Sequence, residues 1–192
     1  MVTLTEALNR IMKWLQQYTP EFANSFLPGL TREEIEEIIK ALPGKVPEEI
    51  YQLYQFRNGT LKEMKSTVYP LFEFLPLAES VEVCLSIIDN FGKDEPLVYE
   101  GKYLLPFLCD NCCYCAVLLN EEQQPESPVI DIAAECDLSM MYRNLTSMML
   151  TLAEYLESEV CYLDTEGFLV TDDDRKMAQI FQKYNPGLQF LR

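Results

Sequence analysis

Residues 103–119 read YLLPFLCDNCCYCAVLL, and this stretch indicates where the sheet of the fold lies. Two apolar runs of strand length, residues 103–108 and 113–119, flank the turn-forming pair Asp110-Asn111. Runs of this kind on either side of a polar pair are typical of a β-hairpin. We therefore expect residues 103–119 to form two antiparallel neighbours within a sheet.

Helices are predicted on both sides of this sheet. Thr3 with Glu6, and Thr31 with Glu34, have the spacing of capping boxes, and apolar residues follow each pair at helical intervals. The predicted helices cover residues 3–19, 31–42, 47–57, 79–88, 145–156 and 171–184, and the further predicted strands cover 68–77, 97–99 and 129–133. Three helices then precede any strand. This order predicts an α+β fold with N-terminal helices, a central, mostly antiparallel sheet and C-terminal helices.

Apolar residues that share a helical stripe or a strand predict the buried core of a single domain. We expect its members to be Ile35, Ile38, Ile39, Leu53, Tyr54, Phe72, Phe74, Phe107, Val117, Leu119, Ile130, Leu145, Met149 and Leu152.

The composition is that of one globular domain, with 192 residues, 48% of them apolar and 24% charged. No apolar stretch approaches the length of a membrane span, and the N-terminus lacks the pattern of a secretory leader. The seven cysteines have no disulfide-framework spacing, which favours reduced thiols. We therefore expect a soluble, cytoplasmic protein.

Acidic residues dominate the charge, which is −16 at neutral pH. The segment from residue 67 to residue 142 holds 14 acids and only Lys93 and Lys102 as bases, so it carries −12 of that charge. Such a surface repels nucleic-acid phosphates and anionic lipids, and it attracts a basic protein. We expect a protein partner with a basic surface, and neither a nucleic acid nor a membrane.

The acids at the edges and turns of the predicted strands are the candidates for this partner-binding surface. They are Glu73, Glu79, Glu82, Glu100, Asp110, Glu121 and Glu122. The alternative is that these carboxylates form only a solvated face, since net charge acts on solubility before anything else.

Enzymatic chemistry has no specific support in the sequence. Histidine is absent, which excludes Ser-His-Asp triads, Cys-His pairs and histidine-ligated metals. No glycine-rich phosphate loop is present, and the acids from Asp164 to Asp174 do not match an EF-hand loop. We predict no catalytic residues, no cofactor and no metal site.

Four cysteines, Cys109, Cys112, Cys113 and Cys115, lie close enough in sequence to suggest a metal cluster or a redox pair. If Asp110-Asn111 is a two-residue turn, Cys109 faces Cys112, while Cys113 and Cys115 share the opposite side of the second strand. The four thiols then cannot converge on one ion. We therefore predict free thiols that act as small hydrophobic residues.

Several stretches resemble the SUKH superfamily, which includes bacterial immunity proteins and fungal regulators of cell-wall glucan synthesis. The stretches are Phe26-Leu27-Pro28-Gly29-Leu30-Thr31, residues 33–42, Val46-Pro47-Glu48-Glu49-Ile50-Tyr51, Phe56-Arg57-Asn58-Gly59, residues 71–77, Leu105-Pro106-Phe107, residues 113–119 and residues 145–156. The resemblance spans residues 26–158. It leaves an N-terminal helical extension, residues 1–25, and a C-terminal helical tail, residues 159–192, which we expect to pack on the same domain.

The resemblance implies an α+β fold that binds other proteins and is not an enzyme. In bacteria such proteins usually give cytoplasmic immunity against a toxin, often a nuclease, and an acidic face would suit a basic nuclease cleft. An intracellular scaffold or signalling regulator on the same fold is the alternative. The sequence departs from the family at Asp110-Asn111-Cys112, where a Gly- and Asp-rich turn is common, so a family-like binding loop is not expected there.

Overall fold

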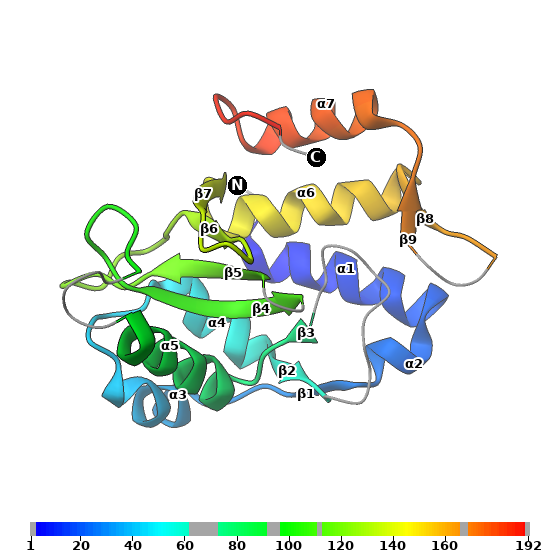
Figure 1. Ribbon diagram of the computed structural model, residues 1–192. Helices are drawn as coiled ribbons and strands as arrows, with labels where there is room; N and C mark the ends of the chain where they lie inside the picture. The colour runs from blue at the N-terminus through cyan, green and yellow to red at the C-terminus, as the bar shows by residue number, and fades with distance from the viewer. Residues whose placement is uncertain (1–2, 62–72, 92–96, 111–112, 166–168, 191–192) are drawn as a thin grey trace.

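An antiparallel five-stranded sheet with helices at both ends of the chain forms the centre of the molecule (Figure 1). The structure is a computed structural model that describes residues 3–61, 73–91, 97–110, 113–165 and 169–190. The strands lie in the order β3 (Glu73–Phe74), β4 (Leu104–Asp110), β5 (Cys113–Leu118), β6 (Val129–Ile132) and β7 (Leu138–Tyr142). The predicted α+β fold is confirmed.

The N-terminal helices begin where the capping boxes predict. Thr3 accepts the backbone N–H of Glu6 at the start of α1 (Leu4–Tyr18), and Thr31 does the same with Glu34 at α3 (Arg32–Ile38). The remaining elements here are α2 (Pro20–Ala23), the 3₁₀ turn η1 (Ile39–Ala41) and α4 (Glu48–Phe56). The prediction that three helices precede any strand is wrong, because β1 (Phe26–Pro28) comes before α3 and pairs with β2 (Arg57–Thr60).

Two glycines in these first elements lie where backbone segments touch. A Cβ on Gly29 would stand 1.8 Å from the carbonyl oxygen of Gln55, and a Cβ on Gly59 would stand 2.4 Å from the nitrogen of Pro76. Gly59 also has a φ of +82°, which L side chains rarely adopt. The neighbouring Asn58 accepts the backbone N–H of Leu77, the first residue of α5 (Leu77–Phe91). The Asn58-Gly59 pair therefore fixes where α5 begins.

The central hairpin forms, but its register differs from the sequence prediction. Asp110 pairs with Cys113, and Cys109 pairs with Tyr114, so the assignment of Cys109 opposite Cys112 is wrong. A register irregularity between Pro106 and Leu108 also changes which side chains of β4 point to each face of the sheet. Cys112 itself lies outside the described residues.

Other strand predictions need correction. Of the strand expected over residues 68–77, only β3 is a strand in the described part, and Leu77 already belongs to α5. Residues 97–99 form a single bridge between Tyr99 and Lys102 and no strand. The strand β7 and the hairpin of β8 (Cys161–Leu163) and β9 (Leu169–Thr171) were not predicted.

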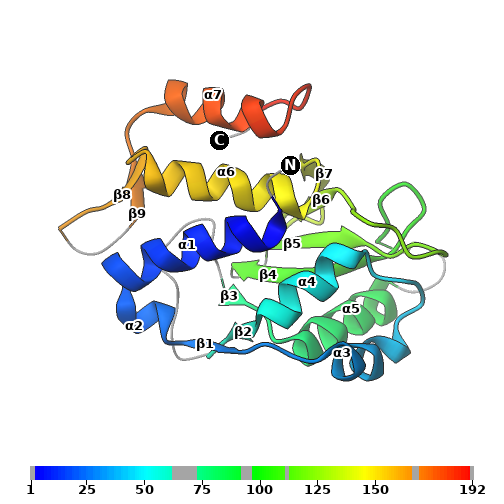
Figure 2. The ribbon, with the colours of Figure 1, turned by 180° about the vertical axis from the view of Figure 1, so that it is seen from behind.

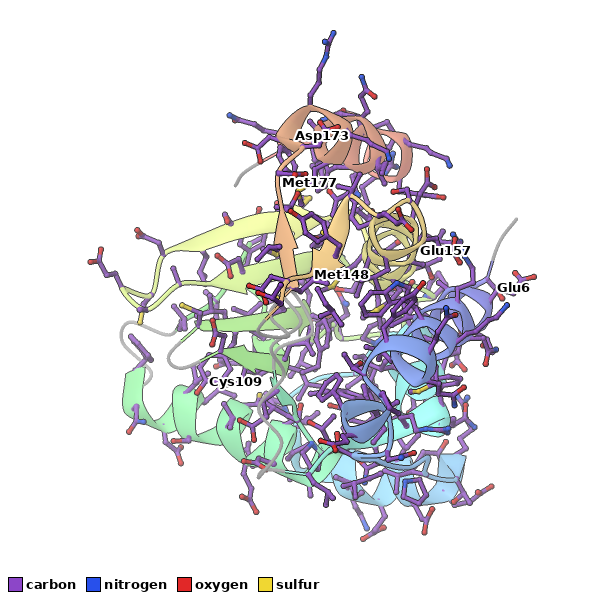
Figure 3. All side chains as sticks on the ribbon, turned by 90° about the vertical axis from the view of Figure 1, so that its right-hand side faces the viewer. Glu6, Cys109, Met148, Glu157, Asp173 and Met177 are labelled. Atoms are coloured by element: carbon purple, nitrogen blue, oxygen red, sulfur yellow. The ribbon has the colours of Figure 1, made fainter. Side chains whose placement is uncertain are left out.

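Three helices, α1, α6 (Leu145–Glu157) and α7 (Asp174–Tyr184), lie side by side, with α6 in the middle (Figures 1 and 2). Arg10 of α1 binds both carboxylate oxygens of Glu157 on α6, at 2.9 and 2.5 Å. Figure 3 shows Glu157 at the outer margin of α6 and Met148 on the inner part of the same helix. The last helix is capped by Asp173, which accepts the backbone N–H of Lys176, so it begins at Asp174 and not at the predicted residue 171.

Asn185 fastens the end of α7 to the start of α6. It is fully buried, accepts the N–H of Arg143 and the hydroxyl of Ser147, and donates to the hydroxyl of Thr151. Since every polar atom of its amide has a partner, the C-terminal helix is held in one position on α6. The boundaries proposed at residues 25/26 and 158/159 stay a prediction.

The predicted burial of the core residues is largely confirmed, but they do not all share one cluster, because Ile130 belongs to a second, smaller apolar cluster with Leu104, Ala116, Leu118 and Ile132. The buried members are Ile35, Leu53, Tyr54, Phe74, Phe107, Val117, Leu119, Ile130, Leu145, Met149 and Leu152. Ile38 and Ile39 are only half-buried, because the helix tightens into η1 at Ile39 and turns their stripe away from the core. Phe72 lies outside the described residues. Among the described helices, none is long and apolar enough to span a membrane.

A buried carboxylate closes the N-terminus of α6. Glu49 of α4 is only 4% exposed, and it accepts the backbone N–H groups of Leu145 and Thr146 at 3.2 and 2.8 Å, together with the Thr146 hydroxyl. Asn144 accepts the next N–H, that of Ser147. The first three N–H groups of α6, which have no partner within the helix, are thus all bonded to oxygen.

Replacing Glu49 by Ala should lower the free energy of unfolding by about 2–4 kcal/mol, because buried N–H and O–H donors lose their acceptor. Urea unfolding, monitored by the fluorescence of Trp14, measures this change in the free energy of unfolding. Gln55→Ala, an exposed change on the same helix, is the control and should stay within about 0.5 kcal/mol of wild type. Equal stability of the two variants would contradict the role of Glu49.

The stability of the protein should also depend on pH through Glu49. Burial raises the pKa of this carboxyl above its ordinary 4.5, and the hydrogen bonds from Thr146 and Leu145 only partly oppose this. A raised folded-state pKa stabilises the fold below the unfolded pKa, and this contribution is lost as pH rises through the folded pKa. The stability of wild type relative to Glu49→Gln, measured by urea unfolding at a series of pH values, should therefore fall as pH rises from 4.5 through the raised folded-state pKa of Glu49.

Candidate functional site

An acidic hollow lies at the end of the sheet where β4 begins and β5 ends. Figure 1 shows how these two strands run side by side. Three of the seven predicted partner-binding residues, Glu100, Glu121 and Glu122, line it together. The other lining residues are Pro43, Gly44, Gly101, Lys102, Tyr103, Leu119, Asn120 and Gln124. Its volume is about 590 Å³, within the range of pockets that accept a small ligand or a few side chains. We call this feature the acidic hollow.

The floor of the acidic hollow is built by backbone pairing between segments far apart in sequence. Lys45 and Asn120 exchange two backbone hydrogen bonds, at 2.6 and 3.0 Å, and the N–H of Leu119 donates to the carbonyl of Tyr103 at 2.8 Å. The loop between α3 and α4 is thereby fixed against the end of β5. These hydrogen bonds bring together residues 43–44, 100–103 and 119–122, which line the hollow.

The loop that follows β5 is held along its whole length. The N–H of Glu48 donates to the carbonyl of Gln124 at 2.9 Å, and the side chain of Gln123 donates to the Glu48 carboxylate at 2.8 Å. Further along, the Ser127 hydroxyl accepts the N–H of Leu118. The loop therefore presents Glu121 and Glu122 from a backbone with few alternative positions.

Glu100 reaches the acidic hollow from a tight turn. Tyr99 and Lys102 exchange two backbone hydrogen bonds of 3.0 Å, which leaves Glu100-Gly101 as the two turn residues. Both have positive φ, 51° and 75°, the geometry of a type I′ turn. Glycine, asparagine and aspartate favour this conformation, whereas a glutamate there costs about 1 kcal/mol. Glu100 thus occupies a strained position at the rim of the hollow.

The other four predicted residues lie elsewhere. Asp110 is at the far end of β4, about 20 Å along a seven-residue strand from the hollow, and Glu73 of β3 pairs with Cys109 beside it. Glu79 and Glu82 are on α5. The seven acids therefore do not form one surface. The sequence did not indicate that Pro43-Gly44, which follow the helix predicted over residues 31–42, and Asn120 help to line the hollow around three of them.

Acid–base or metal chemistry finds no assembled site among the described residues. No group of three or more Cys, Asp or Glu side chains there could hold a metal ion. Burial raises the pKa of two acids, Glu49 and Asp131. They do not form a pair, because Glu49 caps α6 while Asp131 lies on β6 opposite Cys115.

An apolar cavity between α1, α4 and the sheet is too small to be a substrate site. Its volume of about 40 Å³ is that of a small packing void. Its walls include Leu8, Leu15, Leu53, Phe74 and Met149, which belong to the main core. We assign this cavity to core packing.

The thiols should differ in reactivity according to burial. Burial raises the pKa of Cys84 and Cys115 to about 12 and that of Cys161 to about 11, so few thiolates form near neutral pH. Iodoacetamide at about pH 8 should label half-buried Cys109, Cys113 and Cys136 first, as peptide mapping would show. Equally fast labelling of Cys84 would contradict this.

The protein should contain no stoichiometric zinc. In the described part of β4 and β5, Cys109 lies opposite Tyr114 and Cys113 lies opposite Asp110. Because these are neighbouring pairs along the two strands, the side chains of Cys109 and Cys113 point to opposite faces of the sheet. Elemental analysis of protein purified without chelator is the measurement. About one equivalent of zinc, lost together with stability when Cys112 and Cys115 are replaced, would overturn the prediction.

A scan against models of protein families finds none that matches the chain, and a search of curated proteins finds no matching sequence.

Proposed function

We propose that the protein is a non-enzymatic, protein-binding module and that the acidic hollow receives a basic segment of its partner. The observation that carries the proposal is the convergence of Glu100, Glu121 and Glu122 from two loops on one concave site. All three side chains are exposed. Lys102 also lines the hollow, so the net charge of its titratable lining is −2.

The fixed backbone of the acidic hollow supports a binding role. Ordering a loop on association costs free energy, and a loop that is already ordered avoids this cost. The hydrogen bonds of Asn120, Gln123 and Gln124 hold the loop that carries Glu121 and Glu122 before any partner arrives. The strained turn at Glu100 fits the same view, since strain is kept in a fold mainly where it serves function.

The net charge of −16 favours a basic protein as the partner. A strongly acidic molecule accelerates encounter with a basic surface, and a concave acidic site concentrates that attraction. The same charge disfavours nucleic-acid phosphates and anionic membranes as ligands.

The resemblance to the SUKH superfamily supplies the finer part of the proposal. It supports an immunity-type protein that acts in the cytoplasm and neutralises a toxin. A nuclease fits best, because its phosphate-binding cleft carries the arginine and lysine side chains that carboxylates can occupy in place of phosphate. The acidic hollow would then block the cleft and not alter the toxin chemically.

Reversing the three charges should slow association strongly. Replacing Glu100, Glu121 and Glu122 together by Lys should lower the association rate about tenfold or more at low salt and flatten its salt dependence. A partner is first captured from native lysate with the wild-type protein. Stopped-flow mixing of that partner with each variant across a salt series then gives the rates.

A control variant separates site from net charge. Changing Glu21, Glu33 and Glu159 to Lys alters the total charge by the same amount at exposed positions that do not line the acidic hollow. This control should keep most of the wild-type rate at physiological salt. Equal slowing in both variants would show that only net charge matters, and the acidic hollow would then not be the binding site.

A further inference from the structure

We draw no further inference here: the strongest candidate, the patch of apolar side chains where η1 meets the C-terminal half of α5 (Ile39, Leu42, Leu85 and Ile88), is left only half-buried by the described residues, and nothing in the structure shows what covers it.

Discussion

The hydrogen bonds between the Glu49 carboxylate and the N-terminus of α6 are the constraint on which most of the structure depends. A charged group is costly to bury, but here it meets the positive end of a helix dipole and two N–H groups that need an acceptor. The contact joins α4, which contacts the acidic hollow's loop, to α6, which carries α1 on one side and α7 on the other. The Glu49 side chain thus connects α4 with the group of helices α1, α6 and α7.

The acidic hollow follows from the same arrangement. Because α4 is fixed by Glu49, its first residue, Glu48, offers an N–H to Gln124 and a carboxylate to Gln123 in a fixed place. Arg32 also binds that carboxylate and lies over the ring of Tyr51, at 4.1 Å from its centroid. The loop after β5 is therefore positioned by the helical part of the fold and not by the sheet alone. The position of the proposed binding surface thus depends on the same helices that pack the core.

Local signals in the sequence predicted the long elements well and the short ones poorly. Capping boxes at Thr3 and Thr31 placed two helix starts correctly, because the signal and the structure involve the same four residues. Strands of three residues such as β1 and β8 carry no periodicity, and only their partners make them strands. The acidic hollow was predicted only in part, because its residues are brought together by contacts between distant segments of the chain. Glu100 and Glu121 are far apart in sequence, and only the pairing of β4 with β5 and of Lys45 with Asn120 unites them.

The contact of Gly59 with Pro76 has a consequence for the natural variation of this protein. Backbone atoms of Leu75 and Pro76 occupy the space that any side chain at position 59 would need, and the positive φ excludes a simple adjustment. Asn58 depends on that same bend to reach the N–H of Leu77. Among orthologues, the dipeptide should therefore be inherited as a unit, and a lineage that loses the glycine should also lose the asparagine and change the length of the helix that follows.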